Sequence, residues 1–428
     1  MAPTLVAAAA VAVLLAAIAV IAGNLVIALM ALPLVLAAAI GWDRLPAADG
    51  RLSTRLTLTD AGGGRVAYRL ETSLPERVAA VVVRQSLLGA EPRELVLAGW
   101  QADDLAGEVA LLHSGPQEVV RFELRLLGDE QAAISLPEEP IVGELVVAPA
   151  STRVRSLPLP LRLQGMTGTH ASARLGDGGE FRDIHPFNPG DRLRRIDWRA
   201  TARLGMSAGE LYVRRTNALA DATVLIVMDS RDDVGEEVAE WSANAAGKKG
   251  LSSLDVAREA ASSLAGAYIA AGDRVGFQDL SSRARMIAHA GGTRHLWKLA
   301  RAIEVTAPSQ VPFRHRRAPI VPPGALVYLL SSLLDDQPAE LALRWLSGGH
   351  RVIAVDVLPP PRFARADRRQ RIAHRMIMMA RDDRIRMLRS HGVELLRWAT
   401  DEDALPLTAR LELLSRPVRR RGSQAVWR

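Results

Sequence analysis

Charged and aromatic residues that could take part in chemistry gather in one short stretch of the sequence. The stretch "NPGDRLRRIDWRATARLG" covers residues 188–205 and holds five arginines, two aspartates and one tryptophan. Arginine and aspartate side chains at this density form ion-pair networks, and a tryptophan offers a large contact surface. The stretch is therefore a candidate framework that joins neighbouring domains, a candidate partner-binding surface, or a candidate catalytic site.

Local sequence predicts how this stretch folds. The tetrapeptide "NPGD" at 188–191 suits a type II turn, because proline sets the first φ angle and glycine supplies the positive second one. We expect Asp191 to cap a short helical turn that follows. Asp197 falls on the apolar side of the next helical turn, so we expect it to be partly buried and to need an arginine partner. In the framework hypothesis Trp198 is a buried anchor.

Motifs of known enzyme classes give little support to catalysis. "GMSAG" at 205–209 matches the nucleophile-elbow pattern G-x-S-x-G, but an elbow follows a strand and precedes a helix. Here the pattern precedes the strand-like "ELYVRR", which predicts a loop. The sequence has no HExxH, P-loop or dinucleotide-binding glycine pattern, its nine histidines are scattered, and it has no cysteine. We predict no catalytic residue and no enzymatic activity, with a hydrolase as the remote alternative.

The N-terminal residues predict membrane attachment. Residues 5–40 contain no charged residue, and a helix that crosses a bilayer needs about 20 apolar residues. We expect residues 1–42 to form a hairpin of two transmembrane helices, at about 5–22 and 25–40, with Trp42 at the membrane interface. A cleaved signal peptide is the alternative, although the leading "MAPT" carries no positive charge.

Charge near this hairpin predicts the orientation. Arg44, Arg51 and Arg55 follow the second apolar segment, so the positive-inside tendency places the large domain in the cytoplasm and the protein in the cell inner membrane. The net charge of +7 fits anionic lipid beside the anchor as well as nucleic acid. A nucleic-acid binder would interleave aromatic residues with the cations. The basic helix expected at 368–389 has none, and its methionines and isoleucines predict packing against the domain.

Two folded domains are expected between the hairpin and the basic helix. Residues 43–165 hold short runs with period-two alternation, such as 120–126, separated by turn residues, which predicts an all-β sandwich. Residues 221–358 alternate apolar strands with helical stretches, which predicts an α/β domain with a mainly parallel sheet. Ligands of such sheets lie beyond the carboxyl ends of the strands, here after "VLIVMD" and "VYLLSS". Residues 359–428 follow as a basic helix and tail.

The segment 166–220 resembles the signature of the domain of unknown function 58 family. That signature combines an acidic–aromatic pair, a Pro-Gly-Asp turn, an Arg-x-Ile-Asp-Trp core and an Ala-Arg ending. The residues that match it, which we take as binding or framework residues, are Glu180, Phe181, Pro189, Gly190, Asp191, Arg195, Asp197, Trp198 and Arg203. The resemblance implies a membrane-anchored protein with a von Willebrand factor A-like (Rossmann-like) domain. It also implies association with MoxR-type AAA+ ATPases and no established enzymatic activity.

The resemblance also raises the question of a metal. Type A domains often hold Mg²⁺ after the first strand through Asp-x-Ser-x-Ser, with a distant threonine and aspartate. Asp229 fits that pattern, but Arg231 stands at the first serine position, Asp233 at the second, and Ser332 where an aspartate is expected. Thr293 is a weak candidate for the distant threonine.

A guanidinium at a ligand position opposes a dication, so we predict a degenerate site and no cofactor. The alternative is a Mg²⁺ site rebuilt around Asp229, with Asp232 and Asp233. The sequence thus predicts a cytoplasm-facing, membrane-anchored adaptor that binds protein. Through the resemblance, its expected partner is a MoxR-type ATPase, in the assembly or remodelling of an envelope or metallo-complex.

Overall fold

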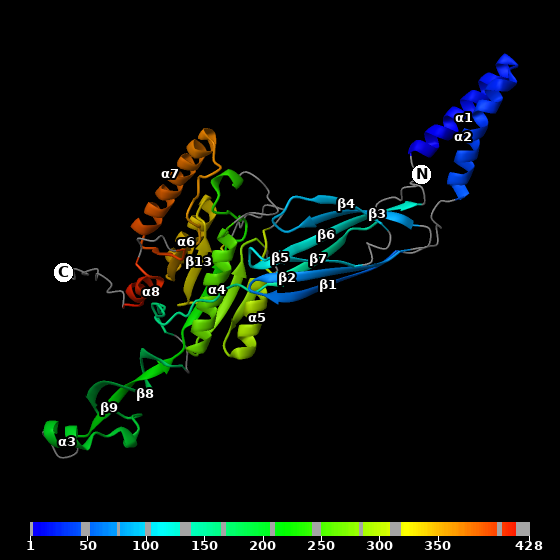
Figure 1. Ribbon diagram of the computed structural model, residues 1–428. Helices are drawn as coiled ribbons and strands as arrows, with labels where there is room; N and C mark the ends of the chain where they lie inside the picture. Colours follow the sequence, from blue (N-terminus) through cyan, green and yellow to red (C-terminus); the bar gives the residue numbers. More distant parts are fainter. Residues whose placement is uncertain are drawn as a thin grey trace. The chain divides into compact units, whose positions relative to one another are not determined.

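Two compact units make up the protein (Figure 1). The first unit holds the described residues before Val147, except His113–Gly115. The second unit holds His113–Gly115 and all described residues from Val147 onward. The computed structural model describes residues 3–43, 52–74, 78–98, 104–128, 138–163, 168–205, 210–241, 250–281, 286–308, 318–399 and 405–416.

A helical hairpin opens the first unit. Helix α1 (Pro3–Ala22) and helix α2 (Leu25–Asp43) pack on each other, close to the predicted boundaries. Gly23 has a φ of 59°, and the Asn24 side chain accepts a hydrogen bond from the amide of Val26 at 2.9 Å. In the part of the chain that the structure describes, no helix is both long enough and apolar enough to cross a membrane. The two helices are confirmed, and their transmembrane character is not supported.

Two antiparallel sheets complete the first unit. One has the order β1-β2-β5 and the other β4-β3-β6-β7, and side chains from both share one apolar core. Within that core the rings of Tyr68 and Phe122 lie 5.8 Å apart. The strands are β1 (Ser53–Gly62), β2 (Arg65–Ser73), β3 (Val78–Leu87), β4 (Arg93–Ala98), β5 (Asp104–Ala110), β6 (Gly115–Gly128) and β7 (Ile141–Val147). The two-sheet architecture agrees with the predicted sandwich, although the sequence pattern missed β5.

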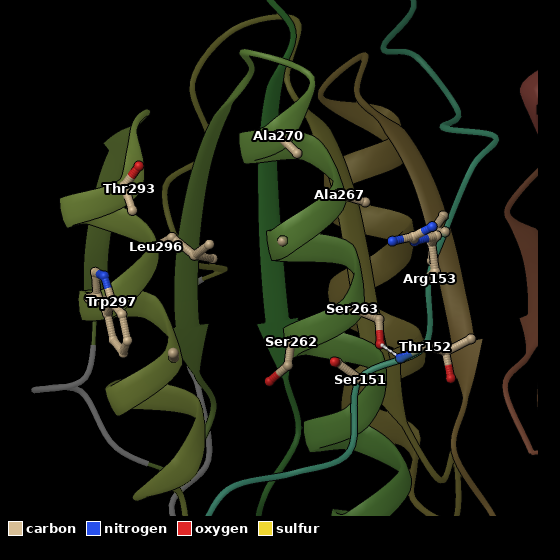
Figure 2. Close-up of a pocket in the computed structure, with 13 residues that line it drawn as sticks. Ser151, Thr152, Arg153, Ser262, Ser263, Ala267, Ala270, Thr293, Leu296 and Trp297 are labelled. Atoms are coloured by element: carbon tan, nitrogen blue, oxygen red, sulfur yellow. Dashed lines mark hydrogen bonds between the residues drawn. The ribbon is translucent and has the colours of Figure 1, made fainter.

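Residues 147–163, which we assigned to the sandwich, belong to the second unit instead. They lie against helix α4 (Ser253–Ala270), where the amide of Thr152 donates to the hydroxyl of Ser263 at 2.9 Å (Figure 2). The hydroxyl of Tyr268 donates to the carbonyl of Pro158 at 2.5 Å. This segment has no regular structure, and side chains of α4 hold it in place. Hydrophobic periodicity in the sequence cannot reveal such contacts.

The second unit is built on a six-stranded sheet with the order β12-β11-β10-β13-β14-β15. All neighbouring pairs are parallel except β11 and β12. Counted from β10, this is the 3-2-1-4-5-6 order of a doubly wound sheet. The strands are β10 (Thr223–Met228), β11 (Arg274–Asp279), β12 (Met286–Ala290), β13 (Leu326–Ser331), β14 (Arg351–Asp356) and β15 (Glu394–Arg397). The predicted α/β domain with a mainly parallel sheet is confirmed.

Helices cover both faces of this sheet. Alternate residues of β10 enter different cores, so that Val224 and Ile226 pack under α4 and α5, whereas Leu225 and Val227 pack under α6. The central residues of β10, β13 and β14 are almost all apolar because both faces of these strands are buried. The helices that follow α4 are α5 (Thr293–Glu304), α6 (Asp336–Ser347), α7 (Arg368–Ser390) and α8 (Leu407–Ser415), and one short 3-10 helix is η4 (Val238–Glu240).

A two-stranded ribbon also belongs to the second unit. Strands β8 (His170–Pro186) and β9 (Tyr212–Ala220) pair antiparallel from His170 opposite Ala220 to Pro186 opposite Tyr212. Gly176 and Phe181 both face Thr216, so the backbone between them bulges out of the register. The 3-10 helix η3 (Leu193–Arg195) and helix α3 (Trp198–Leu204) lie at the far end of the ribbon (Figure 1). We call this ribbon with its two helices the arm.

Helix α7 reverses the predicted packing. It begins with a capping box in which Asp367 and Gln370 exchange hydrogen bonds, as its sequence allows. The side chains it buries are Arg381 and Leu388, whereas Met376 and Met379 are exposed. The prediction that its methionines pack against the domain is wrong, because a carboxylate at the end of β14 attracts an arginine to the inner face.

That carboxylate is Asp356. The guanidinium of Arg381, 1% exposed, forms an ion pair with it and donates through Nε to the carbonyl of Ser332 at 2.8 Å. Arg397 approaches the other oxygen of Asp356 at 3.4 Å. Because unpaired charges are costly in an apolar environment, α7 and the sheet depend on each other here.

We therefore expect Arg381→Ala to lower the free energy of unfolding by about 3–5 kcal/mol, since it leaves a buried carboxylate without its main partner. Denaturant unfolding followed by fluorescence measures the loss. The control is Arg386→Ala, whose pair with Asp383 is exposed and should count for about 0.5 kcal/mol or less. Equal effects of the two variants would refute a structural role for Arg381.

Candidate functional site

The turn at the end of β8 has the predicted form. The amide of Asp191 donates to the carbonyl of Asn188 at 2.9 Å, and Gly190 has a φ of 105°. The Asp191 carboxylate accepts a hydrogen bond from the Asn188 amide at 2.9 Å. The Asp191 side chain therefore stabilises the turn itself. The prediction that it caps a helix is wrong, since the N-cap residue of η3 is Arg192.

Asp197 takes the capping role one helix later. Its carboxylate accepts a hydrogen bond from the amide of Ala200 at 2.9 Å, at the start of α3. Its own amide donates to the carbonyl of Tyr212 at 2.8 Å, which ties α3 to β9. Asp197 is partly buried, as expected, but a helix amide takes the place that we predicted for an arginine.

Arg195 holds the two strands of the arm together. Its guanidinium donates to the carbonyl of Gly176 at 2.8 Å, and the hydroxyl of Thr216 donates to the same carbonyl at 2.7 Å. A Cβ atom at Gly176 would lie 2.3 Å from the Cβ of Ala218, so only glycine allows this approach. Arg195 is thus a framework residue, within the arm itself.

Trp198 is not a buried anchor. Its side chain is 69% exposed, and Leu193 and Leu204 beside it in the sequence are exposed as well. Several arginines of the same segment are also exposed: Arg192, Arg194, Arg199 and Arg203. The prediction that Trp198 is a buried anchor is wrong, and the end of the arm instead carries exposed apolar residues together with exposed arginines. We call these three apolar and four basic side chains the arm tip.

The remaining signature residues lie along the ribbon. Phe181 is half exposed, and the guanidinium of Arg214 lies 5.2 Å from its ring centroid. Glu180 is in β8, but its side chain lies outside the described residues. "GMSAG" begins at Gly205, the C-cap of α3, and precedes β9, which is the reverse of the order an elbow needs.

A second candidate site lies where the order of the sheet reverses, between β10 and β13. Ligands of doubly wound sheets bind at this switch point. Asp229 follows β10, and its carboxylate accepts a hydrogen bond from the hydroxyl of Ser331 at 2.8 Å. The sequence-based expectation that these two strand ends meet is confirmed.

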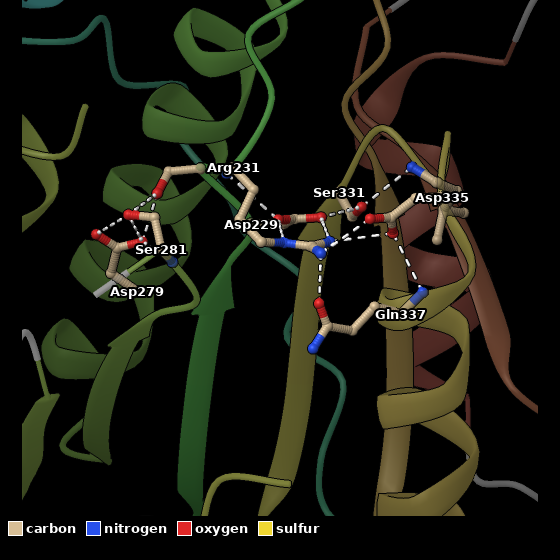
Figure 3. Close-up of polar contacts among 9 residues, drawn as sticks. Asp229, Arg231, Asp279, Ser281, Ser331, Asp335 and Gln337 are labelled. Carbon is tan, nitrogen blue, oxygen red and sulfur yellow. Dashed lines mark hydrogen bonds and ion pairs between the residues drawn. The ribbon is translucent and has the colours of Figure 1, made fainter. Parts of the chain in front are cut away.

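The side chain of Arg231 fills this switch point (Figure 3). Its Nε and Nη2 donate to the two oxygens of Asp229 at 2.8 and 3.0 Å. Its Nη1 and Nη2 donate to Asp335 at 2.8 and 3.1 Å, and Nη1 also donates to Gln337 at 2.5 Å. Burial alone would lower the pKa of this guanidinium, but Asp229 and Asp335 raise it above its usual value. A permanent cation of the chain therefore bridges the two carboxylates.

The other metal candidates do not converge on Asp229. Asp233 accepts a hydrogen bond from the amide of Leu254 at 3.2 Å, at the start of α4. Thr293 follows β12, whose Ala290 pairs with Val275 near the amino end of β11, so it lies at the opposite end of the sheet. Among the described residues, Asp232 included, no group of three or more acidic, histidine or cysteine side chains could hold a metal. These residues do not fit Mg²⁺.

Sequence reasoning missed two partners of Arg231 at this edge. Asp335 and Gln337 begin α6, where the Asp335 side chain caps the helix by accepting from the Gln337 amide. Leu333, in the loop before them, has a φ of 56°, a left-handed conformation that a bulky residue rarely adopts. The capping pattern of "DDQPAEL" was a readable signal for the helix, but not for the contact with Arg231.

Asp279, at the end of β11, also escaped the sequence analysis. It is fully buried and accepts hydrogen bonds from the hydroxyls of Ser230 and Ser281, the latter at 3.0 and 3.1 Å (Figure 3). The hydroxyl oxygens of Ser230 and Ser281 lie 2.8 Å apart. Both strand-end aspartates next to the switch point are therefore occupied by groups of the chain itself.

These contacts predict the response to metal. Addition of millimolar Mg²⁺ should leave the Tm of the unmodified protein unchanged. An intact site, with Mg²⁺ at a hundred times its Kd, would add about 2.7 kcal/mol to the free energy of unfolding. Arg231→Ser removes the cation between Asp229 and Asp335, so it should lower the Tm, and Mg²⁺ should then restore part of the loss. The double variant Arg231→Ser, Asp229→Asn is the control and should not respond. A Mg²⁺ shift in the unmodified protein that Asp229→Ala abolishes would mean that the site is intact.

A protein-family model matches part of the chain. Residues 183–363 match the family model described as "Protein of unknown function DUF58". No curated protein matches the chain. The matched range includes the arm tip and the switch point with Arg231, and it ends in the loop after β14. Over these residues, the chain is similar to the DUF58 family, as its signature motif predicted.

Proposed function

We propose that this protein is an adaptor, held at the inner membrane by the α1–α2 hairpin, that recruits a protein partner through the arm tip. The partner that the family resemblance favours is a MoxR-type AAA+ ATPase. The outcome would be assembly or remodelling of an envelope or metallo-complex. The α/β domain would be of the von Willebrand factor A-like kind, which its 3-2-1-4-5-6 strand order supports.

The observation that carries this proposal is the exposure of Trp198 on a well-supported helix. Tryptophan and arginine are the residue types that dominate binding energy at protein interfaces. Here α3 is fixed by the cap at Asp197 and by the hydrogen bond from the Tyr212 amide to the Thr201 hydroxyl at 3.0 Å. A rigid support lowers the entropy that binding costs. The exposed arginines of the arm tip would favour a partner surface that carries carboxylates.

The switch point also supports a binding role for this protein. The usual ligand position of a doubly wound sheet is filled by the Arg231 side chain, which is bound on both sides by carboxylates. Reactions there would first require this ion-pair network to open. Recognition by exposed surfaces needs no such opening, which favours a binding protein over an enzyme.

We expect Trp198→Ala to abolish partner capture without loss of stability. The side chain is exposed, so its truncation should change the free energy of unfolding by about 0.5 kcal/mol or less. Affinity capture of the tagged protein from native membranes, followed by mass spectrometry, should recover a MoxR-type ATPase with the unmodified protein and not with the variant. Trp297→Ala, at another exposed tryptophan, is the matched control and should retain it.

Two outcomes would contradict this assignment. Recovery of the same partner with Trp198→Ala would show that the arm tip does not bind it. A large drop in Tm for the variant would instead return Trp198 to the framework.

The proposed location rests on the hairpin. Many of its large aliphatic side chains are exposed, Val20 and Ile21 among them, and such a surface favours an apolar environment. We expect the protein to stay in the membrane fraction after carbonate extraction. Protease added outside intact spheroplasts should leave the large domain whole, because Arg55 and its neighbours favour the cytoplasmic side. Digestion of that domain would overturn the orientation.

A further inference from the structure

A groove lies between helices α4 and α5 on the second unit. It has a volume of about 760 Å³, and its α4 side is formed by the small residues Gly266, Ala267 and Ala270. Leu296 and Trp297 form the α5 side (Figure 2). A Cβ atom added at Gly266 would meet no atom within 4 Å, so the groove is open above this residue.

Trp297 separates this groove from a second hollow. The second hollow has a volume of about 650 Å³ and an apolar floor that includes Ile287, Ala302 and Val305. The indole of Trp297 lines both and is 73% exposed, whereas the residues that fix α5 to the domain, such as Leu299 and Ile303, are buried. An exposed tryptophan between two apolar hollows is a surface that costs free energy until it is covered.

Cations surround these hollows. Arg153 lines the first, and Arg294, Lys298 and Arg301 line the second. Among the described residues that line the two hollows there is no aspartate or glutamate, although Arg301 pairs with Glu304 at 3.7 Å. Charge complementarity therefore favours an occupant that combines carboxylates with an apolar side chain.

Polar groups on α4 suit a peptide backbone. Ser263 already accepts the backbone amide of Thr152, from a segment of the chain that crosses the helix. Ser262 lines the groove, and its hydroxyl has no hydrogen-bond partner in the described part of the chain. A buried hydroxyl without a partner is unfavourable.

We propose that this groove binds an acidic peptide segment of a protein partner, with an apolar side chain of that segment packed against Trp297. The contact goes beyond the role of the arm tip and does not depend on it, since the two surfaces share no residue. The chain would thus carry one surface for its ATPase and another for a second protein.

The test uses the full-length protein in detergent and a phage library of random peptides of about 12 residues. The best peptides, once fluorescein-labelled, are titrated by fluorescence polarisation. We expect them to carry net negative charge and at least one aliphatic or aromatic residue. Trp297→Ala should weaken their binding by about tenfold or more, and higher salt should weaken it further.

Two more variants define the position. Gly266→Met places a side chain in the open groove without a steric clash at Cβ, so it should block the peptide while leaving the Tm unchanged or higher. Trp198→Ala removes an exposed tryptophan elsewhere and should leave the peptide affinity unchanged. Loss of ATPase capture with retained peptide binding separates the two proposals.

Several results would overturn the inference. These are the absence of enriched peptides, enrichment of neutral or basic ones, and equal binding to the unmodified, Trp297→Ala and Gly266→Met proteins. Phosphatidylglycerol vesicles serve as a parallel probe. Vesicle binding that requires Trp297, without peptide binding, would assign the groove to a lipid surface and also reject the proposal.

Discussion

The packing of the second unit depends on charge balance at the carboxyl edge of its parallel sheet. Asp229 directly follows β10, strands β11 and β14 end in Asp279 and Asp356, and all three side chains are buried. Buried carboxylates need a cation or several donors. The chain supplies Arg231 to the first, serine hydroxyls to the second and Arg381 to the third. Each solution uses the chain's own groups, so the edge is complete without an external ion.

This completeness is the reason why we propose that recognition takes place away from the switch point. A doubly wound sheet normally offers its ligand site where the strand order reverses, but here a guanidinium occupies it and ties α6 to β10. The surfaces that we propose for partners carry exposed tryptophans on helices whose own positions are fixed. Trp198 stands on α3, which a cap and the β9 backbone hold, and Trp297 stands on α5, whose inner face is packed in the core. Both surfaces lie among cations, which predicts acidic partner surfaces for both.

The sequence revealed the fold better than it revealed the sites. Continuous apolar runs predicted β10, β13 and β14 because strands buried on both faces have no polar side. The Pro-Gly turn was predictable because backbone angles depend on local residue types. Two inferences failed for one shared reason: an apolar residue was assumed to face inward. In α7 and in the arm, inner positions are set by a carboxylate or by backbone pairing between distant residues. Apolar side chains such as Met376, Met379 and Trp198 are therefore exposed, although Leu388 of α7 is buried.

The sequence alone also does not show which arginines are buried. In this chain nearly all cations are arginine, so its presence in a motif does not tell a buried partner from an exposed contact. The buried arginine and the exposed ones differ in whether a strand ends nearby in a buried carboxylate. Arg231 follows β10 by three residues and returns to the carboxylate before it, whereas Arg199 and Arg203 lie on a helix at whose start the carboxylate of Asp197 is already used as a cap. An arginine therefore turns inward where a strand leaves a buried carboxylate unsatisfied, and it stays on the surface where a helix amide has satisfied that carboxylate first.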